Sequence, residues 1–124
     1  MVKDIRRFTP SFTTLADGSA AMLHITDLIG EEDGPVVGIS GGIHGDENTG
    51  SQTVLELYRI LKDMRIRGTI RLLPVANPSA MVARSRFSPL DCRDLNREFP
   101  GDRNGTYSQQ LAAALAEHFL GTID

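Results

Sequence analysis

The feature that most constrains the fold is a strand, a helix and a second strand in succession between residues 35 and 76. Residues 35–40 form a short apolar run bounded by glycines, which predicts a strand buried on both faces. Apolar residues recur at helical spacing from Val54 to Met64, and residues 69–76 are again apolar and β-branched. A strand, helix and strand in this order predict a βαβ unit with parallel strands. We therefore expect an α/β fold with a mostly parallel or mixed sheet and flanking helices.

The segments on either side of this unit add weaker signals. Residues 20–29 mix alternation with apolar character, which predicts an antiparallel or edge strand. Residues 79–105 form a connection much longer than an ordinary loop, and such connections are usually functional or disordered. Thr106 and Gln109 have the spacing of a capping box, so we expect a helix to begin there and to end at Gly121.

Composition narrows the function classes. The chain has 124 residues and a net charge of −3, as expected for one domain and unfavourable for nucleic-acid binding, which depends on a basic surface. Cys92 is the single cysteine, so no internal disulfide can form. The sequence shows neither a signal peptide nor a membrane-spanning apolar run, and we expect a cytoplasmic protein that does not contact a membrane.

A glycine-rich corner follows the first strand and contains the sequence Gly-Gly-Ile-His-Gly-Asp-Glu, residues 41–47. His44 and Glu47 lie where a strand ends and a helix begins, the edge at which open α/β sheets bind ligands. Zinc accepts nitrogen from His and oxygen from Glu, so this pair is a candidate metal site, with Asp46 as a residue that could orient a ligand. The pair could equally cap the helix and form surface hydrogen bonds.

A second polar cluster lies in the long connection. Its members are Arg84, Arg86, Arg93, Asn96 and Arg97 together with Asp91, Asp94 and Glu98. Arginine pairs with carboxylates through two parallel hydrogen bonds, so the cluster is a candidate carboxylate clamp. The alternative is a loop that is held to the protein by its own Arg–Asp pairs.

The corner, Asn77-Pro78 and the segment Asp-Leu-Asn-Arg-x-Phe-Pro-Gly at residues 94–101 together resemble the succinylglutamate desuccinylase and aspartoacylase family. This family belongs to the zinc carboxypeptidase-like enzymes, and the resemblance covers the chain from about Ile25 onward. It implies a zinc-dependent deacylase with Zn²⁺ on His44 and Glu47. Asn96 and Arg97 would bind the substrate carboxylate.

The resemblance also implies a reaction, the hydrolysis of an amide in an N-acyl amino acid or a similar small carboxylate. Zinc lowers the pKa of a water molecule to about 7 and polarises the carbonyl. Arg86 would polarise the same carbonyl, although Arg84 and Arg93 are close enough in sequence to be alternatives. The sequence does not identify the acyl group or the amine.

The chain departs from the family pattern in what it lacks. The family's third zinc ligand, a His on a later strand, and its general base, a Glu, have no counterpart here, so residues 1–124 look like the amino-terminal portion of a catalytic domain. We expect His24 to be solvent-facing or hydrogen-bonded, His118 to sit in the last turn of a helix, and Cys92 to be an inert buried thiol. A truncated sheet would expose an edge that a homo-oligomer could cover.

Two other functions compete with this interpretation. Residues 38–42 match Gly-x-Ser-x-Gly, the nucleophile elbow of serine hydrolases, but an elbow needs its helix immediately after the serine. The second alternative is a catalytically incomplete module that binds a carboxylate or a partner without turnover.

Overall fold

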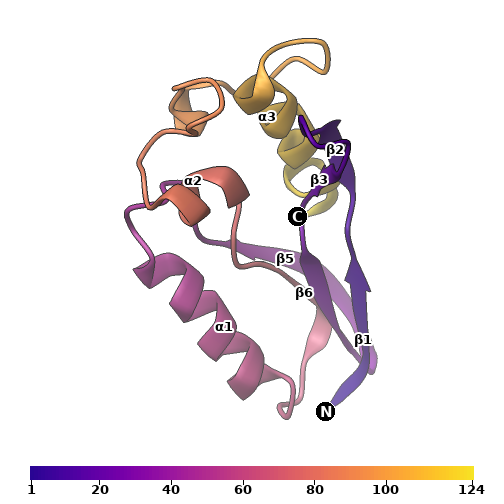
Figure 1. The fold of residues 1–124 in the computed structure, drawn as a ribbon. Helices are drawn as coiled ribbons and strands as arrows, with labels where there is room; N and C mark the ends of the chain where they lie inside the picture. The colour runs from indigo at the N-terminus through magenta and orange to yellow at the C-terminus, as the bar shows by residue number, and fades with distance from the viewer.

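The structure is a computed structural model that describes residues 1–124 (Figure 1). Its strands are β1 (Val2–Phe8), β2 (Ser11–Thr14), β3 (Ala20–Met22), β4 (Ile25–Gly30), β5 (Glu32–Ser40) and β6 (Arg67–Leu73). Its helices are α1 (Thr49–Leu61), α2 (Pro78–Ala83) and α3 (Tyr107–His118), with short 3-10 turns η1 (Leu95–Arg97) and η2 (Leu120–Thr122).

Four strands form the main sheet in the order β1-β4-β6-β5, and β2 and β3 form a separate hairpin. Strands β5 and β6 pair in parallel, with Val36 opposite Thr69 and Ser40 opposite Leu73. Helix α1 connects them, which confirms the predicted βαβ unit. Strand β4 is antiparallel to both β1 and β6, so the sheet is mixed.

Helices α1 and α3 cover opposite faces of this sheet. Successive side chains of a strand point to opposite faces, and on β6 Leu72 packs into a cluster with Val54 of α1, whereas Leu73 packs with Leu111 of α3. The α3 cluster is the larger one and extends to the hairpin and the long connection. Packing in this cluster therefore holds the long connection, which follows α2, against α3.

One prediction about the strands needs correction. The segment predicted to be a strand buried on both faces is β5, which is an edge strand, largely exposed or half-buried, because only β6 pairs with it. The prediction of an antiparallel or edge strand at residues 20–29 is confirmed by β4, which is antiparallel to both of its neighbours and lies inside the sheet. The outer edge of β5 is met at Val36 by Asp124, whose backbone N–H donates to the Val36 carbonyl and whose side chain accepts from the Val36 N–H, both at 2.8 Å.

A buried ion pair connects β4 and β6. Asp27 accepts two hydrogen bonds from Arg71, at 2.8 Å from Nε and 2.7 Å from Nη2. The Arg71 guanidinium also donates to Thr122 and lies 5.1 Å from the centre of the Phe8 ring. The pair holds the carboxyl-terminal turn against the middle of the sheet.

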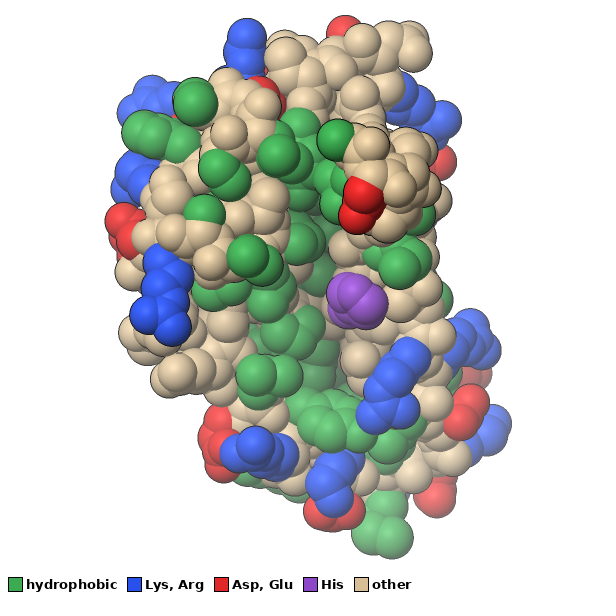
Figure 2. All heavy atoms as spheres, viewed as in Figure 1, with side chains coloured by type: hydrophobic (Ala, Val, Ile, Leu, Met, Phe, Trp, Pro, Cys, Tyr) green, Lys and Arg blue, Asp and Glu red, His purple; other side chains and the backbone are tan.

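The largest hollow is an apolar groove of about 670 Å³ between the β2–β3 hairpin, α2 and residues 89–90. Figure 2 shows hydrophobic side chains gathered in the hollow of this face. His24, Val82 and Tyr107 are among the residues that line it, but none of the predicted site residues does. No helix of the structure has the length and apolar character that crossing a membrane requires.

Candidate functional site

The glycine-rich corner is held by backbone hydrogen bonds to the segment that follows β6. The Gly41 N–H donates to the Leu73 carbonyl, and the carbonyls of Gly41 and Gly42 accept from the Ala76 and Asn77 N–H groups, all at 2.9 Å. Because β5 and β6 are parallel, the segments that follow them leave the sheet at the same edge and can pair there. These backbone hydrogen bonds therefore hold the corner at the edge of the sheet without any contribution from side chains.

Close packing explains the glycine at position 45. A Cβ atom there would lie 1.8 Å from the Ala80 carbonyl oxygen of α2, and the Gly45 N–H donates to the Ser85 carbonyl at 2.8 Å. Gly42 has a φ of +72°, a conformation that side chains other than glycine rarely adopt. At Gly45 the space beside the backbone is filled by α2.

His44 projects from this corner toward the long connection. Its Nε2 lies 2.9 Å from Asp94 Oδ1, and its Nδ1 lies 3.8 Å from Glu47 Oε2. The side chain of His44 is 14% exposed, whereas that of Glu47 is 68% exposed. The carboxylate partner assigns the ring proton to Nε2, because a carboxylate accepts hydrogen bonds. The lone pair of Nδ1 is then directed to the side where Glu47 lies.

His44 and Glu47 fit two positions of a zinc site. The 3.8 Å between Nδ1 and Oε2 is shorter than the sum of one Zn–N and one Zn–O bond, which is about 4 Å, so both atoms can reach one ion. Asp94 on the other ring nitrogen is the arrangement that orients metal-binding histidines. No group of three or more His, Cys, Asp or Glu side chains in the structure is arranged to hold a metal ion.

None of the other candidate ligands joins the pair. His24 lines the apolar groove, and His118 Nε2 lies 3.8 Å from Glu117 at the end of α3. Cys92 is exposed rather than buried, with a φ of 56°, so its predicted role as packing is wrong. Asp46 is exposed and has no contact with His44, and the orienting carboxylate is Asp94.

Asp94 is the centre of the polar cluster. Its side chain is 6% exposed, and it accepts hydrogen bonds from His44 and from the Asn96 N–H at 3.0 Å. Arg86 Nη2 lies 3.4 Å and Arg97 Nε 3.9 Å from its other oxygen. Burial by itself raises the pKa of Asp94, but the hydrogen bonds from His44 and Asn96 and the nearby charges outweigh it and hold that pKa below its usual range.

The structure distinguishes Arg86 from Arg84 and Arg93, the two arginines that the sequence left as alternatives to it. Arg86 contacts Asp94 and so lies beside His44, whereas Arg93 forms an ion pair with Glu98 at 3.2 Å. Arg84 ends α2 in a left-handed conformation and lines a different hollow, with Asp46 and Asn48. Arg86 and Arg97 are thus the arginines that the fold brings to the His44 side of the loop.

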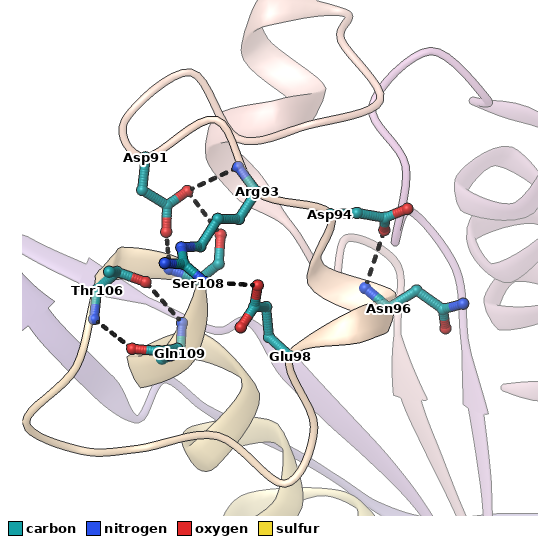
Figure 3. Close-up of polar contacts among 8 residues, drawn as sticks. All are labelled: Asp91, Arg93, Asp94, Asn96, Glu98, Thr106, Ser108 and Gln109. Atoms are coloured by element: carbon teal, nitrogen blue, oxygen red, sulfur yellow. Dashed lines mark hydrogen bonds and ion pairs between the residues drawn. The ribbon is translucent and has the colours of Figure 1, made fainter.

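Residues 84–98, which we call the clamp loop, are anchored to the start of α3 (Figure 3). Asp91 accepts from the Ser108 N–H at 2.7 Å and from the Ser108 hydroxyl at 2.8 Å. Thr106 and Gln109 form the predicted capping box beside this contact. In Figure 3 the Asn96 side chain points away from these anchoring contacts, which leaves its amide available to a ligand.

We expect acid to weaken this anchor. Burial raises the pKa of Asp91, but the hydrogen bonds from Ser108, Thr106 and the Arg93 N–H together lower it more, so its folded pKa lies below the value of about 3.9 of an unfolded chain. Because the pKa of Asp91 is lower in the folded state, its ionised carboxylate contributes its full stabilisation at pH values above the unfolded pKa. This contribution is lost as the pH falls through the folded pKa. Urea midpoints measured from pH 7 down to pH 2 should fall less steeply in acid for Asp91→Asn than for the wild type. Equal acid slopes would contradict this assignment.

The role of Asp94 was missed in the sequence, although the residue belongs to the Asp-x-Asn-Arg segment. The contact with His44 spans 50 positions, so no local pattern predicts it. A usable signal exists in the chemistry: a candidate metal-binding His needs an acceptor for its second nitrogen, and Asp94 is the acidic residue nearest to Asn96 and Arg97 on their amino-terminal side.

Comparison with known proteins places these residues in a family. Residues 33–123 match the model of the succinylglutamate desuccinylase/aspartoacylase catalytic domain. The N-alpha-acetyl-L-2,4-diaminobutyric acid deacetylase of Halomonas elongata is 34% identical over 93 residues, which cover 75% of this chain and 27% of that protein.

Solved structures agree in fold. A Mesorhizobium loti aspartoacylase family protein superposes with a TM-score of 0.87 at 31% identity, and a Rhodobacter sphaeroides succinylglutamate desuccinylase/aspartoacylase with 0.86 at 33%. The product-bound ectoine utilization protein of Ruegeria pomeroyi gives 0.83 at 27%. Each match covers 97% of this chain, which spans 38% of the first two structures and 37% of the third. The predicted zinc carboxypeptidase-like α/β fold is thereby confirmed.

Proposed function

Because the chain belongs to the succinylglutamate desuccinylase/aspartoacylase family, we propose that it carries part of the active site of a zinc-dependent deacylase. The proposed reaction is hydrolysis of the amide in an N-acyl amino acid or a similar small carboxylate. The observation that supports it most is the position of His44, whose Nε2 is fixed by Asp94 while Nδ1 and Glu47 lie 3.8 Å apart.

The other residues have separate roles in this proposal. Arg97 and Asn96 bind the substrate carboxylate, and the half-exposed Arg86 donates to the carbonyl oxygen as negative charge develops on it. When bound, zinc makes water a better nucleophile near neutral pH and polarises the carbonyl. The chain offers no residue that we assign as the general base.

Zinc binding tests this proposal directly. We expect calorimetry to give a dissociation constant in the micromolar range or tighter for the wild-type chain, because two ligands are prepositioned. Zinc affinity should fall by at least about 10-fold in His44→Ala. Loss of a residue that only orients a metal ligand already lowers metal affinity by about 10-fold or more, and His44 is proposed to be a ligand itself. His118→Ala is the matched control, because His118 lies at the end of α3 and contacts Glu117.

Zinc binding and a hydrolysis assay together separate the competing functions. Absence of zinc binding above the His44→Ala background would favour a module that binds carboxylates or a partner without turnover. Hydrolysis that survives chelation but is lost in Ser40→Ala would favour a serine hydrolase, although α1 begins only at Thr49 and so does not follow Ser40 directly. A homo-oligomer that covers an exposed edge of the sheet stays a prediction.

A further inference from the structure

The two carboxylate oxygens of Asp94 face different groups. Oδ1 accepts hydrogen bonds from His44 Nε2 at 2.9 Å and from the Asn96 N–H at 3.0 Å. Oδ2 faces Arg86 Nη2 at 3.4 Å and Arg97 Nε at 3.9 Å. A single buried carboxylate therefore joins the candidate metal ligand to both arginines of the proposed substrate site.

The contacts on the Oδ2 side are ion pairs rather than hydrogen bonds. Their N–O distances of 3.4 and 3.9 Å exceed the range of about 2.7–3.2 Å for an N–H···O hydrogen bond. The side chains of Arg86 and Arg97 are 45% and 82% exposed, so their remaining N–H groups face solvent. Both arginines are attracted by Asp94, but their donors are left free for a ligand, and those of the more exposed Arg97 for a ligand carboxylate.

We propose that Asp94 is an internal carboxylate that competes with carboxylate ligands for Arg97. A ligand carboxylate bound by Arg97 must approach Asp94, and the two like charges repel each other while they share the same cation. Asp94 thereby lowers the affinity of the empty site for carboxylates. The inference rests on the proposed function only in that Arg97 binds a carboxylate, and it requires neither zinc nor hydrolysis.

This competition and a purely structural role predict opposite effects. Asp94 also begins η1 by accepting from the Asn96 N–H, so a variant that only disturbed the loop would bind carboxylates more weakly. Removal of a competing charge should tighten binding instead. We expect a gain of about tenfold, the order of magnitude of one partly screened charge pair a few ångströms apart.

Calorimetry with succinate, in the presence of a chelator, measures this effect on the full chain. The variants are Asp94→Asn and Asp94→Ser, and the serine keeps an oxygen that can accept from the Asn96 N–H. Asp63→Asn is the matched control, because it removes one acidic charge at an exposed side chain that pairs with Lys62 after α1 and belongs to neither the clamp loop nor the site. Both Asp94 variants should bind succinate about tenfold more tightly than the wild type, whereas the control should stay within about twofold of it.

Several results would overturn the proposal. They are unchanged or weaker binding in the Asp94 variants, an equal gain in Asp63→Asn, a gain that persists when Arg97→Ala is added to Asp94→Asn, and no succinate binding by any variant. Loss of zinc binding or hydrolysis would instead count against the proposed function and leave this result standing.

A second measurement covers the case in which neither Asp94 variant folds. Succinate added to the wild-type chain should then shift the NMR signals of the His44 Nε2–H and the Asn96 N–H, the two donors to Oδ1, because Asp94 loses part of its compensating charge. Unchanged signals at saturating succinate would show that Asp94 does not respond to the ligand and would overturn the proposal.

Discussion

Gly45→Ala is expected to lower the free energy of unfolding by about 3 kcal/mol or more, because the new methyl group has no space. Its Cβ would lie 1.8 Å from the Ala80 carbonyl oxygen and 2.1 Å from the Ala80 carbonyl carbon. These are backbone atoms of α2, so the clash cannot be relieved by a side-chain rotation. Either the corner or α2 must move, and His44 moves with the corner.

Gly50→Ala is the matched control for this prediction. Gly50 lies near the start of α1, and the nearest heavy atom to an added Cβ is 3.5 Å away, an ordinary contact. Alanine is favoured over glycine inside helices, so this variant should be as stable as the wild type or more stable by about 0.5 kcal/mol. Urea unfolding of both variants measures the difference, and similar midpoints would show that α2 packs less tightly on the corner than the structure indicates.

Asp27→Ala is expected to cost about 3–5 kcal/mol, because it leaves the Arg71 guanidinium without its partner in the interior. The side chains of Asp27 and Arg71 are 3% and 16% exposed, and two hydrogen bonds join them. The loss would be a large part of the total stability of a domain, which is about 5–15 kcal/mol. Denaturant midpoints at neutral pH measure it.

Two further variants test whether the cost of Asp27→Ala comes from leaving a buried charge unpaired. Glu32→Ala breaks the exposed ion pair with Arg65 and should cost less than about 1 kcal/mol. The double variant Asp27→Leu with Arg71→Met replaces the pair by apolar groups and should recover much of the lost stability. If the double variant were as unstable as Asp27→Ala, the hydrogen bonds of Arg71 rather than its unpaired charge would explain the cost.

The parts of the fold that the sequence predicted correctly depend on local signals. The capping box of Thr106 and Gln109 involves neighbours three positions apart, and the apolar spacing from Val54 onward belongs to α1 alone. The parallel pairing of β5 and β6 followed from the strand, helix and strand order. The start of α1 was placed too early, because Asp46 and Glu47 precede the helix instead of opening it.

The remainder depends on contacts between distant residues. Strand β1 was missed because its partly covered residues recur every third position and charged residues lie between them, which hides the alternation of a strand. Helix α2 lies within the long connection and has only six residues, too few for a periodic pattern. The burial of β5 was overestimated because apolar composition does not reveal whether a neighbouring strand is present. The identities of His44, Glu47, Arg86, Asn96 and Arg97 as site residues stay predictions.

The apolar groove has a consequence for colloidal behaviour. Val82 and Leu90 on its walls are 87% and 56% exposed, so neighbouring molecules can meet through it whenever electrostatic repulsion is weak. Repulsion is weakest near the isoelectric point, about 5.5 for this sequence. Aggregation should therefore set in between neutral pH and the acid range in which the carboxylates take up protons. Acid unfolding is best measured on dilute samples brought rapidly past that point.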